Sequence, residues 1–343
     1  MKHFNKVYVL MLLLFIITMS SCEIKPITTN LEPPSDSSAV DSSSTALNLT
    51  VKHLKSLCIY YGWPSDVNGS NGDITKATST FQQFDLIVFG DGIWKTTHGD
   101  HVNATSIITN LNALGKAVYG YTDLGVSTED LSIADMKTAV DGWAVMGVKG
   151  IFWDDAGYDY NTTRARQDTM INYCHQKGLS VMMNAWNPDD VLGGADMLLD
   201  SSDIYVLESY LISANKYTSL STWRSKANKC AAYEASLGVK MACLSSGDST
   251  ISASYNKTDQ FTQAWVGAAM YNFDYFQITD NMYSANDNTV YYFPNISDSY
   301  GTTWSSPSVS DSASVNYNRS TESWILHVRG DGSTWGFGGF SQP

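Results

Sequence analysis

Short runs rich in β-branched and aromatic residues alternate, between residues 57 and 280, with longer segments of helical composition. The runs occupy residues 57–62, 84–90, 116–123, 149–155, 179–186, 203–209, 238–246 and 273–280. Strands that are apolar on both faces and are joined by helices are typical of a parallel sheet. This alternation predicts an α/β protein built on eight parallel strands.

The segments between these runs predict helices that end at glycines. We expect helices within residues 104–115, 128–147, 162–178, 217–238 and 258–271. A glycine suits the position just after a helix, where the backbone often turns left-handed. Eight strand–helix units favour closure into a (β/α)8 TIM barrel over residues 53–285. The alternative is a doubly wound open sheet, but the first strand is followed by no GxGxxG motif and the chain has no P-loop.

The composition changes after about residue 285, where Ser, Asn, Asp and Tyr dominate. Stretches 289–295 and 323–330 have strand-like composition. We therefore expect residues 286–343 to form a short β-rich extension, a hairpin packed on the barrel. A small carbohydrate-binding module is the alternative interpretation.

The N-terminal residues 1–21 have the three parts of an export signal: a positive start, an apolar run and small residues. Cys22 follows directly, as in a bacterial lipoprotein, so we expect it to carry the lipid anchor. Ordinary signal-peptidase cleavage nearby is the alternative. Residues 22–52 are rich in Ser and Thr and predict a flexible tether. The expected location is the cell envelope, at the outer membrane or the cell surface.

The chain carries 34 acidic and 21 basic residues, a formal net charge of −13. Such a surface disfavours nucleic acid and anionic membranes as partners, beyond the lipid anchor itself. Cys58, Cys174, Cys230 and Cys243 are too widely spaced for a zinc site, although a Cys230–Cys243 disulfide is conceivable. His98 and His101 have no evident third ligand. We expect no metal, no cofactor and a monomeric protein.

Acidic side chains gather where the predicted strands end, which is the end of a barrel that holds active sites. The polar residues at these ends are Asp123, Asp154, Asp155, Asn184, Glu208 and Asp280. Glycoside cleavage needs two carboxyl groups, one to protonate the leaving oxygen and one to attack or stabilise the sugar cation. Asp154, Asp155 and Glu208 are the strongest candidates, because Asp often only caps a helix whereas a paired Asp and a strand-end Glu have no such role.

Aromatic residues lie at the same strand ends and predict stacking surfaces for pyranose rings. They are Tyr60, Tyr61, Trp63, Trp94, Trp153, Trp186 and Tyr210. Packing between the barrel and its helices is the alternative, and for Trp153 the two interpretations are evenly balanced. Trp63, Trp94 and Trp186 follow their strands in loops, where packing explains them less well.

Several of these segments resemble the spherulin-4-like family and, more distantly, the endo-α-1,4-polygalactosaminidase barrels of glycoside hydrolase families 135 and 114. The segments are IYYGWPS (59–65), FDLIVFG (84–90), VYGYTDLG (118–125), GVKGIFWDDAG (147–157), MNAWNP (183–188) and YVLES (205–209). The resemblance implies that Asp154, Asp155 and Glu208 are catalytic. Asp155 stands where such proteins usually carry Glu, and NAWNP replaces their usual NPG pattern.

We therefore expect a secreted, lipid-anchored glycoside hydrolase that cleaves a polysaccharide internally, with an amino-sugar polymer as the substrate that the resemblance implies. One of Asp154 and Asp155 acts as nucleophile or stabiliser and Glu208 as general acid, or Asp155 is the acid and Glu208 the nucleophile. The alternatives are a non-catalytic surface glycan-binding lipoprotein and a structural envelope protein.

Overall fold

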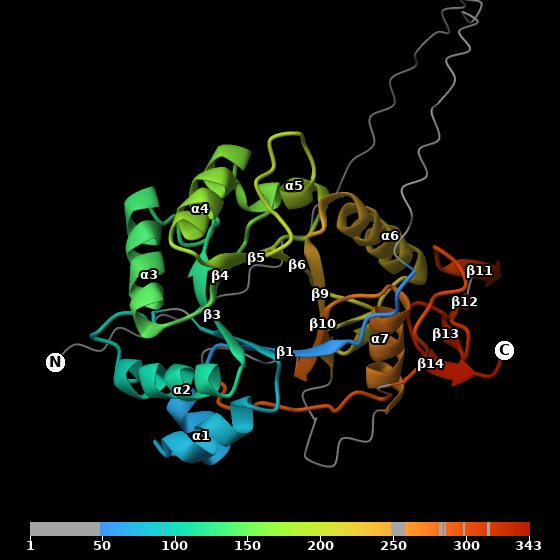
Figure 1. Cartoon of the computed structure of the whole chain (residues 1–343), viewed down its shortest axis with the longest axis horizontal. Coiled ribbons are helices and arrows are strands. Elements are labelled where there is room, and N and C mark those ends of the chain that lie inside the picture. The colour runs from blue at the N-terminus through green and yellow to red at the C-terminus, as the bar shows by residue number, and fades with distance from the viewer. Residues whose placement is uncertain are drawn as a thin grey trace, which may run out of the picture. The chain divides into compact units, whose positions relative to one another are not determined.

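Eight parallel strands close into a barrel in the order β1-β10-β9-β6-β5-β4-β3-β2 (Figure 1). The strands are β1 (Lys55–Tyr60), β2 (Leu86–Phe89), β3 (Ala117–Asp123), β4 (Gly150–Asp154), β5 (Ser180–Asn184), β6 (Ile204–Leu207), β9 (Lys240–Gly247) and β10 (Tyr275–Asp280). Parallel pairing of β1 with β10 closes the ring, with Lys55 opposite Tyr275. The predicted (β/α)8 fold is confirmed, and each of the eight predicted runs overlaps one strand.

The computed structural model describes residues 49–90, 92–247, 258–280, 284, 286–297, 299–313 and 316–343. The predicted signal peptide of residues 1–21, the lipidated Cys22 and nearly all of the tether lie outside the described residues. Within the described residues, no helix combines the length and the apolarity that crossing a bilayer requires.

Helices cover the outside of the barrel (Figure 1). They are η1 (Pro64–Gly69), α1 (Ile74–Phe81), α2 (His101–Ala113), α3 (Ile133–Met146), η2 (Tyr158–Tyr160), α4 (Arg164–Gln176), α5 (Asp189–Leu192), α6 (Leu220–Leu237) and α7 (Thr258–Met270). The side chains of Ser132, Thr163 and Ser219 accept backbone N–H bonds at the starts of α3, α4 and α6. Gly147 and Gly238 end α3 and α6 with left-handed backbones, as the sequence predicts.

The core has two layers, because neighbouring residues of a strand face opposite sides of the sheet. Leu57 and Ile59 of β1 point into the barrel, where they join the inner cluster. Cys58 and Tyr60, between and after them, belong to the outer cluster under the helices. This alternation decides which strand-end residues reach the barrel mouth.

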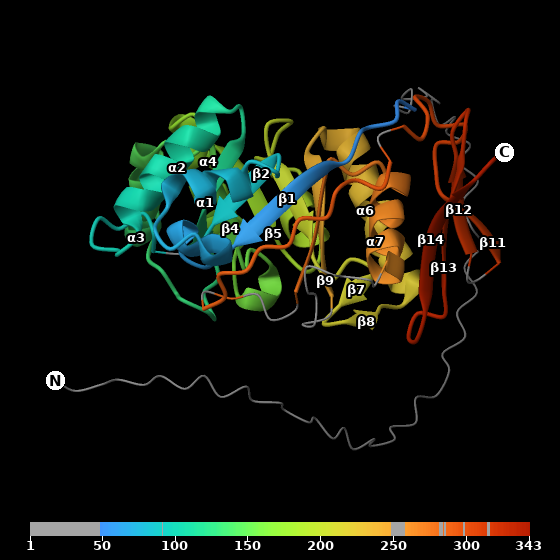
Figure 2. The same ribbon diagram turned by 90° about the horizontal axis from the view of Figure 1, so that it is seen from below.

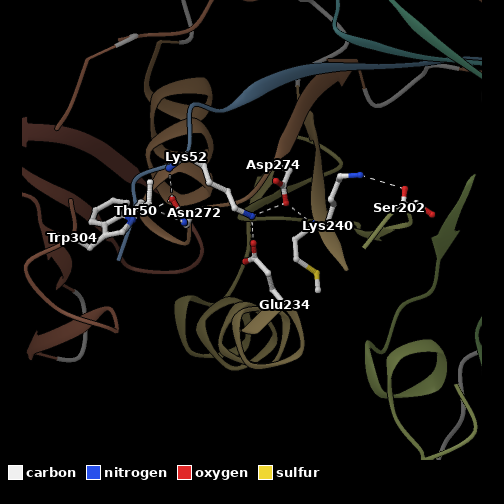
Figure 3. A network of polar contacts seen from close by, with 9 residues as sticks. Thr50, Lys52, Ser202, Glu234, Lys240, Asn272, Asp274 and Trp304 are labelled. Atoms are coloured by element: carbon white, nitrogen blue, oxygen red, sulfur yellow. Dashed lines mark hydrogen bonds and ion pairs between the residues drawn. The ribbon is translucent and has the colours of Figure 1, made fainter. Parts of the chain in front are cut away.

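A polar network connects the segment before β1 to the closed end of the barrel, which is the end where the strands begin (Figure 3). The Lys52 ammonium contacts Glu234 of α6 and lies 3.0 Å from Asp274, just before β10. Asp274 in turn accepts the backbone N–H of Met241 at 3.0 Å. Asn272 accepts from the Lys52 backbone N–H at 2.7 Å and from Trp304 at 3.1 Å. These contacts stabilise the end of the barrel where the strands begin. In this fold the active site lies at the opposite end, where the strands finish.

A four-stranded antiparallel sheet follows the barrel, with β11 (Ser310–Ala313), β12 (Asn316–Ser320), β13 (Ile325–Gly330) and β14 (Gly336–Ser341) in order. It stands against α7 (Figure 2). Gln263 of α7 donates to the Arg329 carbonyl at 2.7 Å. A Cβ at Gly338 would lie 2.4 Å from the Thr262 carbonyl, so glycine allows this close approach.

The strand predicted for residues 289–295 is wrong, because this stretch has no regular structure. A side chain supplies hydrogen bonds to its backbone instead of a neighbouring strand. The Asn68 amide donates to the Val290 carbonyl and accepts the Val290 N–H. Tyr292 packs edge-on against Phe84 at 5.3 Å. The stretch 323–330 does contain a strand, β13, but in a four-stranded sheet and not in a simple hairpin.

A small hairpin, β7 (Ile212–Ser213) with β8 (Lys216–Tyr217), is inserted between β6 and α6. The sequence analysis did not predict it. The cysteines Cys58, Cys174, Cys230 and Cys243 are buried and free, so the disulfide considered for Cys230 and Cys243 does not form.

Candidate active site

Asn184 joins two of the three predicted catalytic acids. Asp154 and Asn184 end the neighbouring strands β4 and β5, and Glu208 directly follows β6. The Asn184 amide nitrogen donates to Asp154 Oδ1 at 2.7 Å and to Glu208 Oε1 at 3.0 Å. The carboxyl groups of Asp154 and Glu208 therefore face one another across the barrel mouth.

This shared donor fixes the separation of the two carboxyl groups. Because both oxygens bond the same nitrogen, at 2.7 and 3.0 Å, they can lie at most about 6 Å apart, and roughly 5 Å apart if both N–H bonds are straight. Retaining glycosidases hold their carboxyl groups about 5–5.5 Å apart, whereas inverting enzymes separate them by about 6.5–9.5 Å to admit a water. The spacing of Asp154 and Glu208 matches the first geometry.

Asp154 accepts more donors than the other acids of the mouth. Burial raises the pKa of its carboxyl group, whereas bonds from Asn184, the Tyr121 hydroxyl and the Asp155 backbone N–H act in the opposite direction. Donors to a carboxylate stabilise its charged form. Burial is the larger effect, so the pKa of Asp154 lies above its ordinary value, but the three donors favour the charged form over what burial alone would give.

Glu208 has fewer such partners. Burial raises its pKa to about 7, with the charge of Asp154 as the second cause. Donation from Asn184 and the nearby Lys226 cation oppose this rise. A carboxyl group with this pKa is protonated in a large share of molecules at neutral pH, which is the state that a general acid needs.

Asp155 adds a third acid beside this pair. Its backbone is left-handed, with φ of 52°, which turns the chain directly after β4. Burial, followed by the charges of Asp154 and Asp123, raises the pKa of Asp155 to about 7. Asp123 is also buried, and burial raises its pKa although the Thr128 hydroxyl and the Gly125 N–H donate to it. The β3 and β4 ends therefore carry acids whose charges raise the pKa of their neighbours.

Three of the predicted aromatic residues lie at the mouth or beside it. Tyr61 packs edge-on against Tyr121 at 5.5 Å, and both cover the inner layer of the barrel. Trp186 is 52% exposed and Trp63 is 45% exposed, with Trp63 beside His98. These open rings can stack on a sugar chain. Asp280 is buried at the end of β10.

Tyr60, Trp153 and Tyr210 do not fit the predicted substrate-binding role, because all three are buried in packing. The Tyr60 hydroxyl donates to the Trp63 carbonyl at 3.0 Å, and the Tyr210 hydroxyl donates to Gly267 at 2.8 Å. Trp153 precedes Asp154 in β4, so strand alternation turns it outward into the helical layer.

Trp94 is also a packing residue, although it lies in a loop. A Cβ placed on Gly142 of α3 would lie 2.5 Å from the indole, so the ring rests directly on that helix. The side chain remains partly exposed, so its contact with substrate stays a prediction.

A cavity of about 150 Å³, which no sequence pattern predicts, adjoins Glu208. Its walls include Trp186, Thr218, Trp223 and Lys226. The Lys226 ammonium donates to the Trp186 carbonyl at 2.9 Å and lies 3.2 Å from the centre of that indole ring. Burial lowers the pKa of Lys226 to about 8. Lys226 thus contacts one face of Trp186 and places a cation near Glu208.

Tyr121 is the other site residue that the sequence analysis missed. Its position two residues before Asp123 in β3 places both side chains on the same face of the strand. Alternation could therefore have identified Tyr121. Lys226 could not be found in this way, because it lies in the middle of α6 and reaches the mouth only through the folded structure.

One group of side chains in the described residues has the composition of a metal site: His175, Asp200 and Asp203. It lies before β5 and β6, at the closed end of the barrel. Asp203 is fully buried and already accepts from His175, the Val181 N–H and the Asp200 N–H. These bonds satisfy the carboxylate and give the cluster a structural role.

No family model and no curated protein matches the sequence. Solved structures with a similar architecture include the glycoside hydrolase domain of PelA from Pseudomonas aeruginosa, at 10% identity and TM-score 0.43, covering 69% of this chain and 99% of that one. An Anoxybacillus alpha-amylase matches at 10% identity and TM-score 0.48, covering 81% and 87%. A Methylomonas D-allulose 3-epimerase matches at 12% identity and TM-score 0.38, covering 68% and 89%. These similarities concern the barrel architecture and do not identify a reaction.

Proposed function

We propose that this protein is a retaining glycoside hydrolase that cleaves a polysaccharide with Asp154 and Glu208. The observation that carries the proposal is the single Asn184 amide that bonds both carboxyl groups. It holds one oxygen of each close to the same nitrogen, which supports the short separation used in double displacement. The same two strand-end acids emerge from the sequence pattern, from the family resemblance and from the geometry.

In the first step Glu208 donates its proton to the glycosidic oxygen as the bond from that oxygen to the anomeric carbon breaks. An oxygen of Asp154 attacks the anomeric carbon and forms a glycosyl ester. In the second step Glu208, now ionised, takes a proton from water. The water oxygen bonds to the anomeric carbon and Asp154 leaves as a carboxylate.

The hydrogen bonds assign the roles. Asp154 accepts from Asn184, Tyr121 and the Asp155 N–H, so its negative charge is supported before and after the reaction. Glu208 has a pKa of about 7 and can exist in both protonation states at neutral pH. Asp155, whose pKa is raised to about 7 by burial and by the charges of Asp154 and Asp123, stays outside the two reacting groups. This choice replaces the alternative in which Asp155 is the acid and Glu208 the nucleophile.

A polymeric substrate is the best match for the open rings beside the acids. Trp186 and Trp63 are each about half exposed and could stack on sugars on two sides of the cleaved bond. An α-1,4-galactosamine-type polymer and internal cleavage are what the family resemblance adds to the proposal. We also propose export and anchoring through Cys22, so that the protein acts on glycans in the cell envelope or outside it.

The direct test is the release of reducing ends from galactosaminogalactan. Wild-type protein should release oligosaccharides, and Asp154→Asn and Glu208→Gln should each reduce the rate at least about 1000-fold. Asp155→Asn should have a smaller effect, because it changes only the electrostatics of the pair. Full activity in all three variants would refute the site assignment.

The second candidate is a non-catalytic glycan-binding lipoprotein, which the exposed Trp186 and Trp63 would also suit. It does not explain why two carboxyl groups are enclosed face to face at a cost in desolvation. Retention of a polysaccharide without any reducing-end release, unchanged in Asp154→Asn, would favour this candidate.

A further inference from the structure

Two exposed aromatic rings lie on the outer face of the C-terminal sheet. Trp335 is 48% exposed and Phe337 is 45% exposed. Gly336 and Gly338, which alternate with them, face the barrel: a Cβ on either would lie 2.4 Å from an atom of Gln263, Tyr217 or Thr262. Trp335 and Phe337 therefore share the opposite face, about 7 Å apart along the strand.

The Phe337 ring reaches over Gly339, where a glycine leaves room for it. A Cβ at position 339 would lie 2.6 Å from Cζ and 2.9 Å from Cε1 of that ring. The Arg329 guanidinium, from the paired position on β13, lies over the ring at 6.0 Å from its centre. A ring held by these contacts offers a stacking platform at low cost in side-chain entropy.

Hydrogen-bonding groups border the platform. His327 pairs with Gly339 across the sheet, and its Nε2 lies 2.7 Å from the Ser341 hydroxyl. On its other side, His327 pairs with Asn318 of β12. Rings with polar groups at their edges match the alternation of C–H faces and hydroxyl groups on a sugar chain.

The turn that leads into the platform packs against the wall of the cavity beside Glu208. A Cβ on Gly332, in the turn before Trp335, would lie 3.2 Å from Ser219 Cα and 3.5 Å from the Thr218 carbonyl. Thr218 is itself a wall residue of that cavity. Figure 2 shows the tip of the β13–β14 hairpin beside β8. The segment that carries Trp335 therefore borders the cavity wall at Thr218.

We propose that Trp335 and Phe337 form a second sugar-binding surface that holds the same polysaccharide several units away from the bond cleaved at Asp154 and Glu208. The inference rests on the proposed function for the identity of the chain it binds. Its occupant is the polymer itself, because the surface is contiguous with the wall of the catalytic cavity. Such a surface strengthens the binding of long chains and leaves the cleavage of short ones unaffected.

Affinity electrophoresis in gels that contain galactosaminogalactan tests the binding. The parent protein carries Glu208→Gln so that the polymer stays intact. Adding Trp335→Ala with Phe337→Ala should weaken retention about 10-fold, whereas Trp335→Phe with Phe337→Tyr should keep it. The control Tyr292→Ala removes another ring that is 39% exposed and should change nothing. Unchanged retention in the double alanine variant, or no retention of the parent, would overturn the inference.

Turnover separates this inference from the proposed function. With Glu208 intact, the double alanine variant should cleave a tetrasaccharide of the polymer at the wild-type rate but show a KM for the polymer raised about 10-fold. Polymer cleavage with equal KM in both proteins would leave the hydrolase standing and remove the platform. Loss of retention without any cleavage by wild-type protein would support the platform and remove the hydrolase.

Discussion

Asn184 Nδ2 lies 2.7 Å from Asp154 Oδ1, and both residues are the last of their strands, β5 and β4. The second bond of the same nitrogen, to Glu208, turns this strand-end contact into a bridge between the two proposed catalytic groups. The spacing of the two proposed catalytic groups therefore depends on an amide that takes no part in the proton transfers.

Replacing Asn184 should impair catalysis more than folding. In Asn184→Ala the Asp154 charge loses a donor and the carboxyl groups are free to move, so kcat should fall about 100-fold. Initial rates on the polymer measure the effect. Asn112→Ala is a matched control, because Asn112 donates to the Gly147 carbonyl far from the acids and its loss should affect only stability. Equal kcat in Asn184→Ala and wild type would show that the bridge has no catalytic role.

Lys226 should set the upper limit of the pH range of activity. Glu208 must be protonated to act, so activity is lost as the pH rises through about 7. The Lys226 cation lowers the pKa of Glu208, and Lys226→Met should therefore move the alkaline limb of the kcat/KM profile to higher pH. Lys226→Arg should leave the limb close to its wild-type position. A shift to lower pH in the Met variant would contradict the electrostatic role.

Glu208→Gln should stabilise the protein at high pH. The folded-state pKa of Glu208, about 7, exceeds its ordinary value of 4.5, so the wild type loses stability as the pH rises between these values. The variant has no proton to lose there, so its stability relative to the wild type should be about 3 kcal/mol greater at pH 8 than at pH 4. Urea titrations at the two pH values give the difference.

Glu322 provides the control of opposite sign for that experiment. Backbone N–H groups of Thr302 and Thr303 lower its pKa to about 2. Its contribution to stability is present at neutral pH and disappears as the pH falls towards that value, so Glu322→Gln should destabilise the protein at pH 8. The same direction of change in both variants would indicate that the Glu208 effect does not come from its raised pKa.

Trp186 and Trp153 should respond differently to truncation. Trp186→Ala removes an exposed stacking surface and should raise KM about 10-fold with little change in melting temperature. Trp153→Ala leaves a cavity between the barrel and its helices and should lower the free energy of unfolding by about 3–5 kcal/mol. Thermal melts and polymer kinetics on both variants check the assignment. A large loss of stability in Trp186→Ala would place that ring in the core instead.

The sequence predicted the barrel well because each strand and helix carries its own local pattern. The apolar run 57–62 overlaps β1 and the run 273–280 contains β10, although only the folded barrel shows that they pair. The helix α1 was missed because ITKATSTF is short and rich in threonine. Residues 289–295 have strand composition but no strand to pair with, and side-chain bonds from Asn68 satisfy Val290 instead.

The site was predictable to the extent that chain position fixes it. Asp154, Asn184 and Glu208 were found because barrel strands bring their C-terminal ends together. Trp153 and Tyr60 were misjudged because nearness to a strand end does not say which face a side chain takes. Lys226 reaches Trp186 only through the docking of α6 beside the β5 loop, and no local pattern encodes that contact.

The anomeric configuration of the first product tests the central claim most directly. Proton NMR during the first minutes of polymer cleavage, before the new reducing end equilibrates, reports it. A carboxyl pair about 5 Å apart predicts a product with the same configuration as the bond that was cut. A product of inverted configuration, or no cleavage of the polymer, would contradict the account in which Asp154 attacks and Glu208 transfers the proton.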